Sequence, residues 1–102
     1  KATYPDRPLT TYGTQGYDVA RLIASALKAT GSIDNIDAFR AALKKADFQS
    51  VRGKFSFGSN QHPVQDWYLL EVVKGPDGVP TTKTVRKLIE NYGDIHAKDC
   101  KL

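Results

Sequence analysis

One stretch decides the fold that we expect of this chain, Pro63-Val64-Gln65-Asp66-Trp67-Tyr68-Leu69-Leu70-Glu71-Val72-Val73-Lys74. Successive side chains of a strand point to opposite faces, so Trp67 and Leu69 share one face while Tyr68 and Leu70 share the other. Both faces are mainly apolar, which is typical of a strand covered on both sides. We therefore expect residues 63–74 to be the central strand of a small sheet.

Shorter strands are expected on either side of this stretch. After it, Pro76-Asp77-Gly78 predicts a turn, and the β-branched residues 81–85 predict a partner strand that continues to about Lys87. Before it, Lys-Phe-Ser-Phe at residues 54–57 predicts a short alternating strand. The spacing over residues 85–92 fits either a helix or a strand. We expect irregular structure beyond Lys87, with a short helix possible near residues 95–98.

Two amphipathic helices are predicted ahead of the sheet. Positions 19, 22, 23, 26 and 27 are apolar at helical spacing, and Thr30-Gly31 predicts the end of this helix. We expect it to begin near Tyr17, after a flexible lead-in over residues 12–16, with Thr14 or Gly16 as its cap. Asp18 would then lie in the first turn, at the positive end of the helix dipole.

The second helix is expected to follow a cap at Asp34 or Asn35, with an apolar stripe at Ile36, Phe39 and Leu43. The expected core combines this stripe with the first helix and the central strand. In particular, Leu22, Phe39 and either Trp67 or Leu69 should be largely buried.

Length and composition allow one domain or less, since the chain has 102 residues with ordinary apolar and charged content. No apolar run approaches the roughly 20 residues that span a bilayer. The sequence contains no methionine and opens with Lys1, so we expect a fragment of a larger protein. Residues 1–8 are interpreted as the end of a helix running into a proline-rich connection.

A basic nucleic-acid-binding domain is one alternative, because the net charge is +4. The segment Arg52-Gly53-Lys54-Phe55-Ser56-Phe57 also has a superficial likeness to the aromatic strand of RNA-binding domains. However, its register is wrong, and the basic residues are scattered in pairs among acidic ones, which is typical of a solvated surface. This alternative stays open.

The chain carries no recognisable catalytic motif, metal site or cofactor site. His96 and Cys100 would share a helix face, but a zinc site needs about four ligands and His62 is the only other histidine. The same shortage weakens a cysteine–histidine nucleophile pair. No phosphate-binding glycine loop, nucleophile elbow or paired carboxylates are present. We therefore expect a protein that is not an enzyme.

A collinear set of short segments is more specific than any single motif. The set comprises Gln-Gly-Tyr-Asp-Val-Ala at residues 15–20, Ala-Phe-Arg-Ala-Ala-Leu at 38–43, the segment 46–57, Asn-Gln-His-Pro-Val-Gln-Asp-Trp-Tyr at 60–68, and Asp94 to Cys100. It resembles the C-terminal part of the periplasmic substrate-binding proteins of branched-chain amino-acid-type ABC transporters, the Leu/Ile/Val-binding family. The likeness extends to the subgroup that binds aromatic or other hydrophobic carboxylates.

This resemblance implies a C-terminal piece of the type I periplasmic-binding-protein fold, an α/β fold of two lobes. The piece would hold two helices and a small sheet of three strands. Residues 12–74 would be the last segment of the first lobe, and residues 81–102 would cross the hinge and form the C-terminal tail. The implied partners are a small amino acid or aromatic carboxylate, the membrane permease and the remainder of the polypeptide, and the implied location is the periplasm.

The resemblance also implies which residues face the ligand. Gln15 and Tyr17 are the first candidates, because the family's loop into the Tyr-Asp pair faces the cleft. Asn60, His62, Gln65 and Asp66 are candidates for the cleft or hinge rim, although they could equally only shape the turn. The family's loops that grip the ligand's charged groups lie in earlier sequence, so this piece alone should bind little.

Cys100 is the only cysteine of the sequence. In an exported protein it would be expected to form a disulfide with a cysteine outside this chain, whereas in a reducing compartment it would be a free thiol.

Overall fold

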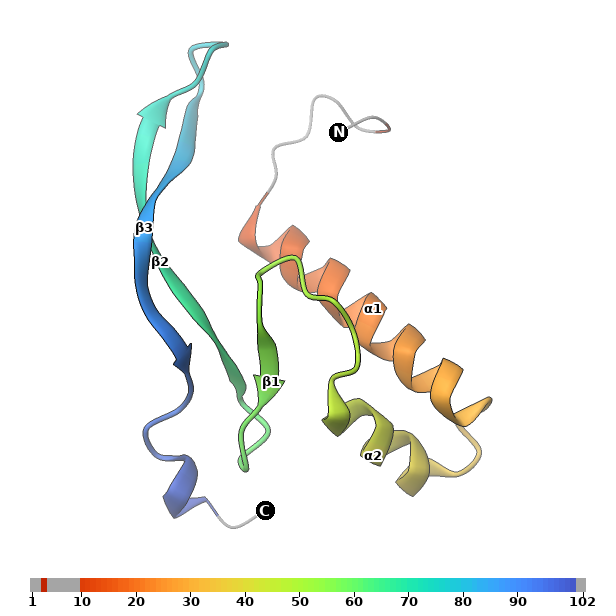
Figure 1. The fold of residues 1–102 in the computed structure, drawn as a ribbon. Helices are drawn as coiled ribbons and strands as arrows, with labels where there is room; N and C mark the ends of the chain where they lie inside the picture. The colour runs from red at the N-terminus through yellow and green to blue at the C-terminus, as the bar shows by residue number, and fades with distance from the viewer. Residues whose placement is uncertain (1–2, 4–9, 101–102) are drawn as a thin grey trace. The chain divides into compact units, whose positions relative to one another are not determined.

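A computed structural model describes Thr3 and residues 10–100 of the chain. The chain divides into two compact units, Lys1–Gly53 and Lys54–Leu102. The first unit contains the two helices and the second contains the three strands (Figure 1). The predicted content of two helices and a three-stranded sheet is therefore confirmed. The helix end and proline-rich connection expected within residues 1–8 lie outside the described residues, apart from Thr3.

Helix α1 spans Thr11–Thr30 and begins six residues earlier than predicted. Its N-cap is Thr10, whose hydroxyl accepts a 3.0 Å hydrogen bond from the Gly13 backbone N–H. The expected flexible lead-in over residues 12–16 is therefore wrong, because this cap lets the helix start before the apolar stripe. The predicted end is confirmed, since Gly31 takes the left-handed conformation with φ of 74°.

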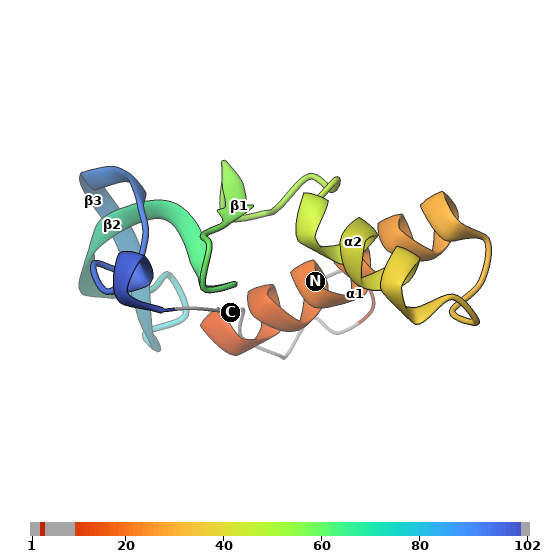
Figure 2. The same ribbon diagram turned by 90° about the horizontal axis from the view of Figure 1, so that it is seen from below.

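Helix α2 spans Ile36–Lys45 and packs against α1 within the first unit, as both views show (Figures 1 and 2). Asn35 is its N-cap and accepts a 3.0 Å hydrogen bond from the Ala38 N–H, which confirms one of the two predicted caps. The buried apolar side chains of the helix pair are small. They are Ala26 in α1 and Ala46 just after α2. The prediction that Leu22 and Phe39 are largely buried is wrong, because both side chains are only half-buried.

The second unit is an antiparallel sheet with strand order β1-β2-β3. Strand β1 spans Phe55–Phe57, β2 spans Pro63–Lys74 and β3 spans Pro80–Tyr92. The central strand, its two partners and the turn at Gly78, with φ of 81°, are all as predicted. The irregular structure expected beyond Lys87 is wrong, because residues 88–92 continue β3 as a strand through pairing with β2. A single helical turn, η1, follows at Ala97–Asp99.

The predicted burial of the central strand is wrong. Trp67 is 50% exposed and Leu69 41% exposed, and the apolar residues of the other face are exposed as well. The physical reason is that β2 and β3 form a long hairpin (Figure 1), whereas the only helical element described in this unit is the three-residue turn η1. An element of that size cannot cover either face of a hairpin of twelve- and thirteen-residue strands.

Candidate functional site

The first two predicted ligand contacts, Gln15 and Tyr17, lie in the N-terminal half of α1 and are exposed. Tyr17 is 51% exposed, and its hydroxyl accepts a 3.2 Å hydrogen bond from Arg21 Nη1. The Arg21 guanidinium also lies 5.7 Å from the centre of the Tyr17 ring. One turn of helix therefore combines an aromatic face with a positive charge.

Arg21 was missed by the sequence analysis, although a signal for it was present. Residues four apart on a helix are neighbours, so a tyrosine at 17 and an arginine at 21 meet on one face. A guanidinium beside an aromatic ring suits an anionic group attached to an apolar body, because it offers paired donors to a carboxylate.

Asp18, next to Tyr17, is 2% exposed and anchors α1 to the segment after α2. Its Oδ2 accepts hydrogen bonds from Ser50 Oγ at 2.6 Å and from Arg52 Nε at 2.8 Å. Its Oδ1 accepts one from the Val51 N–H at 3.0 Å. The predicted position of Asp18 in the first turn is wrong, because the helix starts at Thr11. The helix dipole therefore does not account for its stabilisation.

This anchor sets the ionisation of Asp18. Burial alone would raise the pKa of the carboxyl, but the hydrogen bonds from Ser50, Arg52 and Val51, together with the charge of Arg52, outweigh it and hold the pKa below its ordinary value. The carboxylate is therefore ionised and fully paired at neutral pH. It fixes the part of α1 that presents Tyr17.

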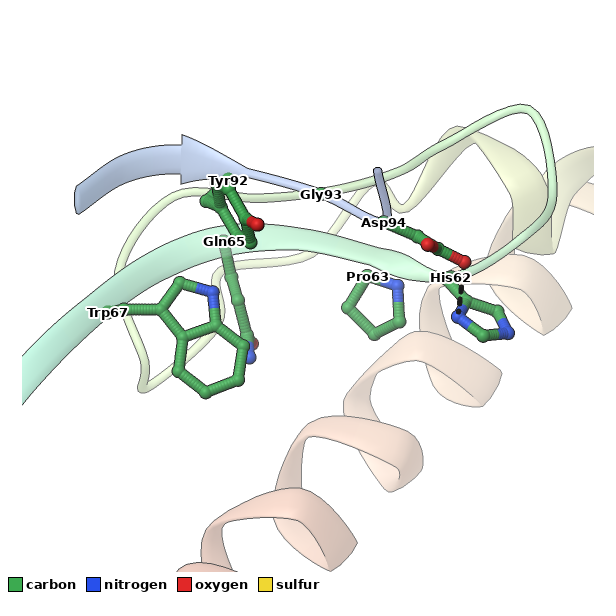
Figure 3. A pocket seen from close by; sticks show the side chains of 7 residues that line it. All are labelled: His62, Pro63, Gln65, Trp67, Tyr92, Gly93 and Asp94. Carbon is green, nitrogen blue, oxygen red and sulfur yellow. Dashed lines mark ion pairs between the residues drawn. The ribbon is translucent and has the colours of Figure 1, made fainter. Parts of the chain in front are cut away.

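The second unit contains a hollow of about 340 Å³ where the β1–β2 turn meets the end of β3 (Figure 3). Two of the four predicted rim residues, His62 and Gln65, line it, and five residues not predicted complete the lining: Pro63, Trp67, Tyr92, Gly93 and Asp94. The antiparallel register brings them together by placing Tyr92 opposite Gln65. Pro63, Gln65 and Trp67 alternate along β2 and point to the same side (Figure 3).

The other two predicted rim residues, Asn60 and Asp66, are buried and do not line the hollow. Asn60 Nδ2 donates to Asp94 Oδ2 at 2.8 Å, while its Oδ1 accepts from the His62 N–H at 3.2 Å. Asp66 accepts from the Asn91 N–H at 3.1 Å and pairs with Lys87 at 2.7 Å. Both residues thus hold the backbone around the hollow.

These contacts also shift the ionisation of the pair formed by Asp66 and Lys87. The hydrogen bond from Lys87, supported by that from the Asn91 N–H, lowers the pKa of Asp66, and the hydrogen bond to Asp66 raises the pKa of Lys87. Both groups are charged at neutral pH, so the positive charge of Lys87 neutralises the negative charge of Asp66.

Asp94 is the acidic group of the hollow. Its Oδ1 accepts a 2.9 Å hydrogen bond from the His96 N–H, and its Oδ2 lies 3.4 Å from His62 Nδ1 (Figure 3). The His96 hydrogen bond is the main cause that lowers the pKa of Asp94, with smaller contributions from His62 and Asn60. Asp94 belongs to the collinear set of segments but was not among the predicted site residues, because its proximity to residues 60–63 arises only from the pairing of β2 with β3.

Three further observations concern the described residues only. Cys100 is exposed and forms no disulfide with them. Among residues 10–100 no group of three or more potential metal ligands gathers. None of the helices in that same part of the chain combines the length and the apolar character needed to cross a membrane.

Comparison with known proteins yields one family. The family described as periplasmic binding protein matches residues 1–77, which is about three quarters of the chain. The match includes α1, α2, β1 and the whole of β2. Comparisons with curated proteins and with solved structures gave no match.

Proposed function

Because the chain belongs to the periplasmic binding protein family, we propose that it is part of the solute-binding component of an ABC importer and takes a small hydrophobic carboxylate. Proteins of this family bind small-molecule ligands outside the cytoplasm and deliver them to membrane transporters. The observation that carries the proposal is the family match over residues 1–77. The comparisons give no support to a nucleic-acid-binding function.

The surface around Tyr17 supports a carboxylate ligand. Arg21 lies beside the Tyr17 ring, and no carboxylate within the described part of the chain forms an ion pair with its guanidinium. A bound carboxylate would neutralise the positive charge of Arg21, and the exposed tyrosine ring would contact the apolar part of the ligand. Gln15, two residues before Tyr17, would offer a hydrogen bond to a polar end. A branched-chain amino acid and an aromatic acid both satisfy this chemistry.

The proposed mechanism is binding without catalysis. Residues 12–74 would be the last segment of the first lobe, and residues 81–102 would cross the hinge and form the C-terminal tail. The remainder of the polypeptide is therefore the necessary partner of this piece. A ligand that contacts both lobes stabilises the closed state, because only that state provides both sets of contacts. The permease would then recognise the closed, loaded form.

Titration calorimetry on the complete binding protein tests this function. Leucine and benzoate represent the two ligand classes, and leucinol and benzyl alcohol are neutral counterparts without the carboxylate. We expect one carboxylate to bind and its alcohol counterpart to bind at least about tenfold more weakly, since a charge-assisted hydrogen bond is lost. Arg21→Gln should reduce this difference.

The matched control is Lys28→Gln, which removes one positive charge from the last turn of the same helix. It should leave the affinity unchanged. If neither carboxylate binds, or if carboxylates and alcohols bind equally, the proposed ligand class is wrong.

A further inference from the structure

We propose that the hollow beside Trp67, Tyr92 and Asp94 binds a small organic ammonium ion. The cationic nitrogen would lie beside the Asp94 carboxylate and the carbon groups against the two aromatic rings. This site is separate from the surface around Tyr17, and the inference does not depend on the carboxylate ligand proposed there.

Two aromatic side chains give the hollow its affinity for a cation with carbon substituents. Trp67 is 50% exposed and Tyr92 42% exposed, although both line the hollow. Tryptophan and tyrosine rings carry negative charge density on their faces and attract ammonium groups within about 6 Å. Contact with the carbon groups also removes apolar ring surface from water.

The charge of the hollow has the sign that a cation requires. Among the residues that the structure describes, Asp94 is the only acidic one that lines the hollow, and no lysine or arginine does so. The nearby cation Lys87 is already paired with Asp66 at 2.7 Å and with Glu90 at 3.0 Å. Asp94 therefore presents a negative charge that no described lysine or arginine of the lining neutralises.

Asp94 also retains hydrogen-bonding capacity after its internal contacts are counted. Its Oδ1 accepts from the His96 N–H, while Oδ2 accepts from Asn60 and faces His62. Each carboxylate oxygen can accept about two hydrogen bonds, so Oδ1 can accept one more. An alkylammonium group donates up to three and suits this position.

Both histidines near the hollow lie close to carboxylates. His62 Nδ1 lies 3.4 Å from Asp94 Oδ2, and His96 Nδ1 lies 3.9 Å from Asp99 Oδ2. An ammonium ligand would therefore share the Asp94 carboxylate with His62.

The size of the hollow restricts the ligand. A volume of about 340 Å³ lies at the small end of the range for ligand sites, which is roughly 300–1,000 Å³. A cation of a few carbon atoms fits within this volume.

A titration of the complete binding protein followed by nuclear magnetic resonance tests the proposal. Trp67 lines the hollow, so its indole N–H resonance, assigned through its loss in Trp67→Phe, reports on the hollow. The probes are butylammonium, neutral butanol and butanoate, which share one carbon chain. We expect butylammonium to bind about tenfold more tightly than butanol, and butanoate to bind most weakly.

Asp94→Asn should remove the preference for butylammonium over butanol, because it keeps the size of the side chain and removes its charge. Asp99→Asn is the matched control, since Asp99 carries the same charge on the same C-terminal segment and does not line the hollow. It should keep the preference. Equal binding of butylammonium and butanol by the unmodified protein would overturn the proposal without any variant, and so would an unchanged preference in folded Asp94→Asn.

Discussion

Ser50 Oγ donates a 2.6 Å hydrogen bond to Asp18 Oδ2 and so joins two residues that are 32 positions apart. The Val51 N–H and Arg52 Nε reach the same carboxylate, at 3.0 Å and 2.8 Å. The segment that follows α2 is thus fixed to α1 by a polar cluster, whereas the buried apolar side chains among the described residues of this unit are alanines. A unit with so small a core depends strongly on its polar anchor.

Asp18→Asn should destabilise the protein by about 3 kcal/mol, because it removes the charge that pairs with Arg52 and replaces an acceptor oxygen with a donor. Urea denaturation would measure the change in the free energy of unfolding. Asp34→Asn, an exposed acid of the α1–α2 connection, is the control and should change it by less than about 0.5 kcal/mol. Similar losses in the two variants would show that Asp18 is not an anchor.

The Asp18 carboxylate should also make the stability of the protein depend on pH in the acid range. The pKa of Asp18 is lower in the folded protein than in the unfolded chain, so its contribution is complete above the unfolded pKa of about 3.9 and is lost as the pH falls through the lower folded pKa. Melting temperatures measured between pH 7 and pH 2 should therefore converge for wild type and Asp18→Asn at the acid end. A difference that stays constant across this range would contradict the assigned linkage.

Leu22→Ala should cost about 1–2 kcal/mol, which is less than for a fully buried leucine, because Leu22 is only half-buried in the first unit. Val19→Ala is the comparison on the same helix, since Val19 is 54% exposed. It should cost less than about 0.5 kcal/mol. A loss above about 3 kcal/mol for Leu22→Ala, measured by urea denaturation, would contradict the half-buried position of this side chain.

The sequence predicted the elements better than their boundaries. The alternation over residues 63–74 and the caps at Gly31 and Asn35 are local features, and each was recovered. The start of α1 was missed because its cap is Thr10, four residues before the predicted cap Thr14. The first turns of the helix are mainly polar, so they show no apolar periodicity. The extent of β3 was left open because residues 85–92 have apolar spacing compatible with either structure, and pairing with β2 settles it.

The burial and the candidate site could be predicted only in part. Apolar residues on both faces indicate that a strand can be covered, but not that a covering element is present, which is why Trp67 or Leu69 was expected in a core. Asp18 was recognised as a helix residue, while its partners Ser50 to Arg52 are brought to it by tertiary folding. Asp94 likewise meets His62 only through the register of the sheet.

Cys100 should be disulfide-bonded in the intact mature protein, to a cysteine outside this chain. The residue is exposed, and a lone cysteine in an exported protein commonly has a partner elsewhere. Such a bond would contribute about 2–4 kcal/mol. Thiol labelling of the denatured, unreduced protein measures it, with a reduced sample as the control. Full labelling without reductant would show that Cys100 is a free thiol.

Tyr17→Ala should weaken binding of the carboxylate ligand by the complete protein by roughly tenfold or more. The ring is 51% exposed beside Arg21, so a ligand can cover its apolar surface at about 25 cal/mol per Å². Calorimetric titration measures the affinity, and Tyr12→Ala is the matched control, since Tyr12 lies in the first turn of the same helix and is 84% exposed. The competing role for Tyr17 is purely structural, as a residue that packs the start of the helix. In that case Tyr17→Ala would lower the melting temperature and leave the affinity of the folded protein equal to that of wild type, which would remove Tyr17 from the site.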